Sequence, residues 1–234
     1  MKKIIISGIF LVFFIAGPTL KATAQEREER QSRGAFNEIS VSSGIDLFLK
    51  QGEEYEIIVE ADKGDIAEVI TEFKGNRLDV YMDGGVFNWF RNTQAKVYVT
   101  VPEVSRLSSS GGSDLKSMGE INGKHIEINC SGGADVEISV SSNTVLLHCS
   151  GGADIKIDGK TDVLKAESSG GADIFAKGLH ANRVVASSSG GADIEVYAIE
   201  EIEASASGGA DVAHYGPAKA TKISESGGGD VRRY

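Results

Sequence analysis

Apolar and polar residues alternate with a period of two along most of residues 105–231, and this alternation restarts at regular intervals. In each stretch, three inward positions lie nine, seven and five residues before an aspartate, and a glycine pair separates them from it. A period of two places these side chains on one face of a strand. A second strand starts directly after the aspartate, with Leu115, Val136, Ile155, Ile174, Ile194, Val212 and Val231 facing inward.

The motif Ser-Gly-Gly-small-Asp occurs seven times, and successive aspartates are 21, 19, 19, 20, 18 and 19 residues apart. Ankyrin, tetratricopeptide and armadillo repeats have longer periods and need helix formers, which are missing here. Strands of about five residues that are joined by tight corners predict one coil of a β-solenoid per repeat. The fold class is therefore all-β, a right-handed parallel β-helix of about seven coils.

Residues 35–104 follow a different pattern, with short strand-like segments separated by turns. Residues 65–73 place four apolar side chains on one helical face and predict one short helix. The tetrapeptide Ser43-Gly44-Ile45-Asp46 echoes the repeat motif, so this segment can also be an elaborated first coil. We interpret residues 35–104 as an N-terminal β-rich capping segment that covers one open end of the solenoid. Its expected strands are Phe36–Val41, Ile45–Lys50, Tyr55–Ala61, Arg77–Met82 and Ala95–Val101.

The N-terminus has the features of an export signal. Two lysines at positions 2 and 3 precede an apolar run over residues 4–17, and Ala22-Thr23-Ala24 is a pattern that signal peptidase accepts. We expect a signal peptide over residues 1–24, with cleavage before Gln25, and no membrane span in the mature chain. The protein is therefore expected to be exported, to the periplasm, the outer surface or the extracellular space.

The expected mature chain begins with a flexible lead over residues 25–34, followed by the capping segment and the solenoid repeats over 105–234. Loss of three lysines leaves 24 − 3 = 21 basic residues against 34 acidic ones, so the formal charge changes from −10 to about −13. This charge disfavours nucleic acid and anionic lipid, and favours cations or polar, uncharged partners.

Three features together resemble a bacterial family, the putative auto-transporter adhesin, head GIN domain. They are the Ser43-Gly44-Ile45-Asp46 strand, the Gly119-Glu120-Ile121-Asn122 stretch and the serial Ser-Gly-Gly-Ala-Asp motifs. The resemblance covers roughly residues 35–231. It implies a secreted or periplasmic β-helical domain of Bacteroidetes-like cell envelopes. It carries no catalytic residues to this chain.

The aspartate column is the first candidate site. Carboxylates stacked about 4.8 Å apart repel each other by roughly 1 kcal/mol per pair even in water, so something must offset the repulsion. One hypothesis is a cation ladder, with calcium as the candidate ion, although the chain lacks the full calcium-binding repeat motif. We favour a structural role in which each side chain accepts backbone N–H groups at its corner. A catalytic acid pair is the third alternative. The candidate ladder is Asp135, Asp154, Asp173, Asp193 and Asp211, with Asp114 and Asp230 completing the column.

Other reactive side chains do not form a recognisable catalytic set. The serine before each glycine pair predicts a hydroxyl ladder, and His125, His148, His180 and His214 do not share its register. Cys130 and Cys149 occupy the same inward column in neighbouring coils, within reach of a disulfide. Parallel in-register neighbours aim their Cβ atoms poorly for bridging, so we favour two buried thiols.

The segment over residues 84–94 is the second candidate site, because aromatic side chains and an arginine gather between two expected strands. It could stack on a sugar ring or contact a partner protein, or fold back as a lid over the apolar end of the solenoid. The candidate ligand-contact residues are Phe87, Trp89, Phe90 and Arg91.

The even, bare coils favour a noncatalytic envelope or surface protein, an adhesin-like scaffold that binds a glycan or a cell-surface protein. The rival hypothesis is a carbohydrate-active β-helix enzyme, a polysaccharide lyase or hydrolase, but such coils are usually longer and carry insertions that build a cleft. A purely architectural homo-oligomer is the third possibility, since the final coil ends in an unpaired edge at Val231. No cofactor or metal is required by any of the motifs.

Overall fold

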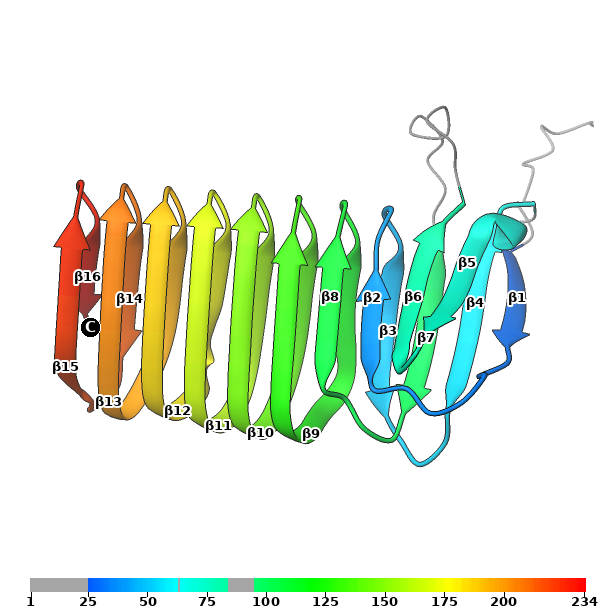
Figure 1. Cartoon of the computed structure of the whole chain (residues 1–234), viewed down its shortest axis with the longest axis horizontal. Helices are drawn as coiled ribbons and strands as arrows, with labels where there is room; N and C mark the ends of the chain where they lie inside the picture. The colour runs from blue at the N-terminus through cyan, green and yellow to red at the C-terminus, as the bar shows by residue number, and fades with distance from the viewer. Residues whose placement is uncertain (1–24, 63, 84–94) are drawn as a thin grey trace, which may run out of the picture.

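The computed structural model describes residues 25–62, 64–83 and 95–234. These residues form strands that wind into a β-solenoid of about seven turns, with one short 3-10 turn (Figure 1). The N-terminal elements are β1 Gln25–Arg30, β2 Glu38–Val41, β3 Asp46–Gln51, β4 Glu56–Asp62, η1 Ile66–Glu68, β5 Val69–Lys74, β6 Arg77–Met82 and β7 Lys96–Val101. The remaining strands are β8 Arg106–Ser110, β9 Asp114–Ser131, β10 Asp135–Gly151, β11 Asp154–Gly170, β12 Asp173–Gly190, β13 Asp193–Gly208, β14 Asp211–Tyr215, β15 Lys219–Ser226 and β16 Asp230–Arg233.

Each coil is a flattened loop with two faces, joined by the Gly-Gly corner. The strands that precede the corner form one face, the pre-corner sheet, which contains β2, β8 and β15 and the second halves of β9–β13. The strands that follow the aspartate form the opposite post-corner sheet, which contains β3, β14 and β16 and the first halves of β9–β13. Pairing between successive coils is parallel throughout.

The aspartate column lines up as the repeat spacing predicts. Asp135 pairs in register with Asp114 on one side and with Asp154 on the other, and Asp211 pairs with Asp193 and Asp230. The predicted solenoid with one coil per repeat is therefore confirmed. A column missed in the sequence is also buried, because the residue directly before the aspartate faces inward: Ser113, Ala134, Ala153, Ala172, Ala192 and Ala210.

The capping segment continues the solenoid. Strand β2 pairs in parallel with β8, and β3 pairs in parallel with β9 through Leu47 and Leu115, so the two strands complete a coil at this end. Ser43 and Gly44 turn the corner with φ values of 66° and 72°. The backbone N–H of Ile45 donates to the Ser113 hydroxyl at 3.2 Å. The hypothesis of an elaborated first coil is supported by this pairing.

Beyond that coil the sheets end in antiparallel pairs. Strand β4 pairs antiparallel with β7, and β5 pairs antiparallel with β6 through a tight turn at Gly75, whose φ is 66°. The Phe36 ring packs between Tyr55 and Phe73, with centroid distances of 5.1 and 5.5 Å. Phe36 belongs to the buried core, and Tyr55 and Phe73 are partly buried and pack against it.

The helix expected over residues 65–73 was wrong beyond its first turn. Only Ile66–Glu68 forms a 3-10 turn, and Val69–Lys74 is strand β5. Val69, Ile70 and Thr71 are β-branched, which favours an extended chain, and β6 offers a full row of backbone partners. Backbone pairing therefore outweighs the helical spacing of the apolar residues.

The flexible lead expected over residues 25–34 is also corrected in part. Residues 25–30 form β1, which pairs antiparallel with β4 at the edge of the post-corner sheet. Arg27 lies 3.4 Å from Glu60, and the Arg30 guanidinium donates to the Ile66 carbonyl at 3.1 Å. This polar segment buries little surface, so its order comes from edge pairing and these side-chain contacts.

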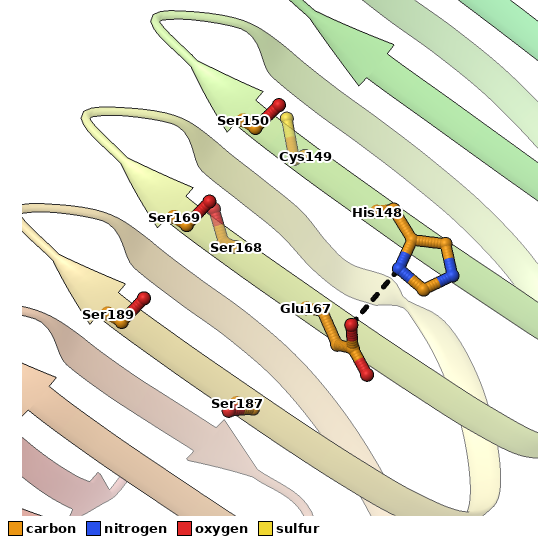
Figure 2. Close-up of a pocket in the computed structure, with 8 residues that line it drawn as sticks. All are labelled: His148, Cys149, Ser150, Glu167, Ser168, Ser169, Ser187 and Ser189. Atoms are coloured by element: carbon orange, nitrogen blue, oxygen red, sulfur yellow. Dashed lines mark hydrogen bonds and ion pairs between the residues drawn. The ribbon is translucent and has the colours of Figure 1, made fainter.

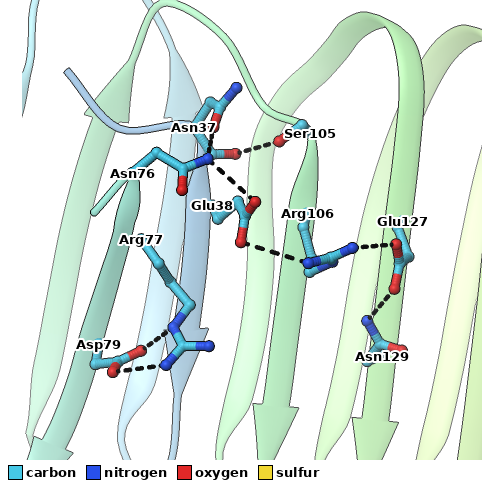
Figure 3. A network of polar contacts seen from close by, with 9 residues as sticks. All are labelled: Asn37, Glu38, Asn76, Arg77, Asp79, Ser105, Arg106, Glu127 and Asn129. Atoms are coloured by element: carbon cyan, nitrogen blue, oxygen red, sulfur yellow. Dashed lines mark hydrogen bonds and ion pairs between the residues drawn. The ribbon is translucent and has the colours of Figure 1, made fainter. Parts of the chain in front are cut away.

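A polar network joins the cap to the solenoid on the pre-corner sheet (Figure 3). The Arg106 guanidinium lies between two carboxylates, 3.5 Å from Glu38 and 2.8 Å from Glu127. Asn76 donates to the side-chain oxygens of both Asn37 and Glu38, at 2.9 and 3.1 Å. The hydrogen bond to Arg106 lowers the pKa of Glu127 below its ordinary value. The network therefore fixes the register between the first coils.

The other end of the solenoid is open. Strand β15 is exposed over all eight residues, and β15 and β16 each pair with the preceding coil on one side only among the described strands. The inward-facing Ile223 is 42% exposed there. Figure 1 places these strands at the opposite end of the rod from β1 and β5.

Candidate functional site

The Gly-Gly corners are the most regular feature of the surface. At the first glycine the chain takes a left-handed conformation, with φ of 84° at both Gly151 and Gly170. A Cβ added at Gly151 would lie 3.1 Å from the Gly132 backbone nitrogen, and one added at Gly208 would lie 2.9 Å from the Gly190 carbonyl oxygen, so a side chain here would press on the corner of the preceding coil. The glycines therefore serve the stacking of the coils.

A buried hydroxyl or thiol closes five of the corners from inside. The Ser188 hydroxyl donates to the Ala192 carbonyl at 2.6 Å, and Ser168 makes the same bond to Ala172 at 2.5 Å. Cys130 and Cys149 occupy equivalent positions, and each thiol donates to the carbonyl four residues later at 3.0 Å. The small column five residues before the aspartate is thus explained by a hydrogen bond that locks the turn.

Both cysteines are free thiols, the arrangement that we favoured. The hydrogen bond with Cys130 and burial raise the pKa of the Cys149 thiol far above its ordinary value. The Cys149 thiol is therefore a protonated donor to its corner carbonyl, which is the unreactive form of cysteine.

Two aspartates of the candidate ladder accept backbone hydrogen bonds from the next coil. The Asp193 N–H donates to Asp173 Oδ1 at 2.9 Å, and the Asp211 N–H donates to Asp193 Oδ1 at 3.0 Å. The backbone N–H groups of Asp135, Asp154 and Asp173 donate to backbone carbonyls of the preceding coil. In the part of the chain that the structure describes, no three acidic, histidine or cysteine side chains converge as a metal site would require. Calcium binding by Asp135, Asp154, Asp173, Asp193 and Asp211 stays a hypothesis, and backbone capping accounts for the two carboxylates.

A shallow depression of ≈ 250 Å³ lies on the pre-corner sheet (Figure 2). His148 Nδ1 is 3.2 Å from a Glu167 carboxylate oxygen across neighbouring coils, and both side chains are exposed. Outward-facing serines surround this pair, among them Ser150, Ser169 and Ser189. Among the described hydrogen bonds none joins a serine to His148, so the depression lacks the serine–histidine pair of a hydrolase.

Two stacked aromatic pairs that the sequence analysis missed lie along the post-corner sheet near the open end. Their tyrosines stand four residues after successive aspartates of the motif. The Tyr197 ring stacks on His180 at 4.3 Å, and Tyr215 stacks on Tyr234 at 5.4 Å. The Lys177 ammonium lies 3.8 Å from the centre of the Tyr215 ring. The sequence signal was present, because Tyr197, Tyr215 and Tyr234 share one register position.

A second depression, of ≈ 170 Å³, lies beside the stacked pair Tyr215 and Tyr234. Its floor includes Ala213, which faces outward two residues after the aspartate, where the flanking coils carry Glu195 and Arg232. The small side chain between two long ones leaves a notch. The lining residues are Asp193, Ile194, Glu195, Asp211, Val212, Ala213, Arg232 and Tyr234. Two residues of the candidate aspartate ladder therefore form part of this notch.

The predicted ligand-contact residues Phe87, Trp89, Phe90 and Arg91, like the predicted signal peptide over residues 1–24, lie outside the described residues. Within the described ranges, no helix could span a bilayer.

A family model described as "Putative auto-transporter adhesin, head GIN domain" matches residues 35–218. This match covers most of the chain, and the chain belongs to that family. The match confirms the resemblance drawn from the repeat motifs. No curated protein matches this chain.

Solved structures share the fold over nearly the whole chain. A putative adhesin from Bacteroides fragilis NCTC 9343 superposes with a TM-score of 0.82 and 22% identity, over 91% of this chain and 98% of that one. A putative adhesin from Parabacteroides distasonis ATCC 8503 has a TM-score of 0.70 and 18% identity, over 91% and 98%. A putative lipid binding protein from the same strain has a TM-score of 0.67 and 17% identity, over 89% and 96%. At these identities the likeness establishes the fold.

Proposed function

We propose that the protein is a noncatalytic, exported, adhesin-like scaffold of the cell surface or envelope, and that its solenoid presents a binding surface to a glycan or a cell-surface protein. The observation that carries this proposal is the evenness of the coils. Long strands β9–β13 repeat without inserted loops, and the two depressions on their outer faces are shallow. Such a surface suits contact with a chain or another surface.

The descriptions of the family and of similar solved structures agree with the proposal. The family is described as an auto-transporter adhesin domain, and two of the similar structures are named adhesins. The lipid-binding name of a third relative adds no argument for lipid, because the formal charge of −10 disfavours anionic membrane surfaces.

The catalytic alternative is less well supported by the geometry. A glycoside hydrolase of the usual kind needs a cleft that places two carboxyl groups on either side of the bond it breaks. In the notch, Asp193 is exposed and one of its oxygens already accepts the Asp211 N–H. His148 and Glu167 lie on an open face without a nucleophile bonded to them. Neither depression encloses a substrate.

Two assays on the same preparation test the proposal. A glycan array measures binding, and incubation with the same polysaccharides followed by reducing-end and unsaturated-product detection measures cleavage. We expect retention on some glycans or cell-surface proteins without product release. Product release that scales with protein concentration would replace the scaffold with the enzyme, and the variant His148→Gln would show whether the first depression is responsible.

A further inference from the structure

The notch at Ala213 combines an apolar floor, an aromatic wall and charged rims in one place. The Tyr234 side chain beside it is exposed, and its ring is held against Tyr215. Glu195 and Arg232 flank Ala213 along the solenoid axis, and the carboxylates of Asp193 and Asp211 line the notch. We propose that this notch is a binding site for one pyranose ring of a neutral polysaccharide.

The charged groups of the notch are held in place before any ligand arrives. The Arg232 guanidinium donates to Asp230 Oδ2 through Nε and Nη2, at 2.8 and 2.7 Å. Hydrogen bonds to Asp230 and to Tyr234 raise the pKa of Arg232 above its ordinary value, so it stays charged. One Asp193 oxygen is fixed by a backbone N–H, which leaves the other for a ligand. Preorganised groups lose little entropy on binding.

A neutral pyranose fits this set of groups better than an anionic sugar, a phosphate or a metal ion. Its ring has apolar C–H faces that pack on an aromatic side chain, and its hydroxyls both donate to carboxylates and accept from a guanidinium. Several carboxylates disfavour an anionic sugar or a phosphate. The described carboxylates do not converge as a metal site does.

The family does not predict this site. The family model ends at residue 218, whereas Arg232 and Tyr234 come from the last coil. The site depends on two particular choices in this chain, the small Ala213 among long neighbours and Tyr234, which stacks on Tyr215. This inference rests on the proposed binding function and names the ligand class and place for it.

Filling the notch tests the inference with little risk to the fold. Position 213 faces outward on a strand, and the equivalent position holds long side chains in other coils, so Ala213→Gln should fold normally. The matched control is Lys116→Gln, at the same register position far from the notch. Tyr234→Ala and Tyr234→Phe test the aromatic wall, and the second variant keeps the ring.

Saturation-transfer NMR on the full chain measures contact with methyl glycosides of glucose, galactose, mannose, xylose and N-acetylglucosamine. We expect transfer from the protein to at least one glycoside. Affinity should fall by roughly tenfold or more in Ala213→Gln and Tyr234→Ala, about 1.4 kcal/mol, should fall less in Tyr234→Phe, which keeps the ring, and should stay near wild type in Lys116→Gln.

Unchanged transfer in Ala213→Gln would overturn the assignment to the notch, and no transfer to any glycoside would overturn the ligand class. The glycan array separates this failure from that of the broader proposal. Array binding that survives both variants would leave the scaffold function intact and remove the site. Absence of all binding, to glycans and to cell-surface proteins, would remove both.

Discussion

The Glu225 carboxylate accepts a hydrogen bond of 2.8 Å from the backbone N–H of Val231 across the last coil. The N–H groups of Asp230, in β16, and of Tyr234, directly after it, donate back to the preceding coil, to the carbonyls of Ala210 and His214. The Val231 N–H therefore points toward the open end, where a further strand would pair. Glu225 holds the column position in which the other coils carry a serine, a cysteine or an alanine, and it satisfies a donor that would otherwise recruit another strand.

Replacement of Glu225, Arg232 and Arg233 by valine should promote self-association. The substitutions free the Val231 N–H and remove the charges that keep an edge strand from pairing. Static light scattering of the full chain should report larger species for the triple variant than for the wild type. A control with Lys50→Val, exposed on β3 away from the edge, should stay unchanged, and a triple variant of unaltered mass would show that another group covers the edge.

The corner hydroxyls should contribute measurably to stability. Ser168→Ala leaves a buried carbonyl with one partner fewer and should lower the free energy of unfolding by about 1 to 2 kcal/mol. The sixth coil offers the reverse experiment, because Ala206 stands where Ser188 stands one coil earlier. Ala206→Ser should be neutral or stabilising. Urea unfolding of both variants measures the two effects, and equal losses in both would contradict the hydrogen-bond explanation.

Mild acid should destabilise the last coils through His214. This side chain is buried, its Nδ1 has no hydrogen-bond partner, and burial and the nearby Arg233 lower its pKa below 6.5. A lowered folded-state pKa means that the unfolded chain binds the proton more readily, so stability falls as pH drops through the unfolded value. His214→Val should flatten the dependence of the unfolding midpoint on pH below about 6.5. The control His148→Gln, at an exposed histidine, should keep the wild-type dependence of the midpoint on pH. If His214→Val keeps it as well, another group causes the acid sensitivity.

Calcium should have little effect on the melting temperature. Asp173 and Asp193 accept backbone N–H groups from the following coil, which offsets part of the repulsion along the ladder without an ion. Thermal melts in millimolar calcium and in chelator should therefore coincide. A shift of many degrees would show that the aspartate column binds cations, by linkage.

The solenoid could be predicted because its information is local and repeated. Every aspartate marks the same corner, so one misjudged coil is corrected by its neighbours, and the register follows from the spacing. The cap has no such redundancy. Ile66, Val69 and Phe73 fit a helical face, and the β-branched residues together with the backbone partners offered by β6 decide that Val69 begins a strand.

The candidate site was harder to predict than the fold. The aspartates and the corner serines were visible because they repeat, whereas the notch depends on an exception, the single alanine between Glu195 and Arg232. The shared position of the tyrosines in the repeat was visible too. Whether they line a binding surface depends on which face of the sheet is exposed to solvent. On a repeat protein, residues that depart from the repeat form the ligand site. Many positions of this sequence depart from the repeat, and the pattern alone does not distinguish Ala213 from the others.

Attachment under flow tests the central claim, a folded solenoid that binds without reacting. Beads coated with the full chain are passed over immobilised polysaccharides and cell-surface proteins, beside beads coated with the same chain unfolded by heat. The account predicts that only the folded chain retains beads, for as long as flow continues, with no fragments released from the surface. Equal retention by both coatings, or beads that detach as the surface is degraded, would contradict it.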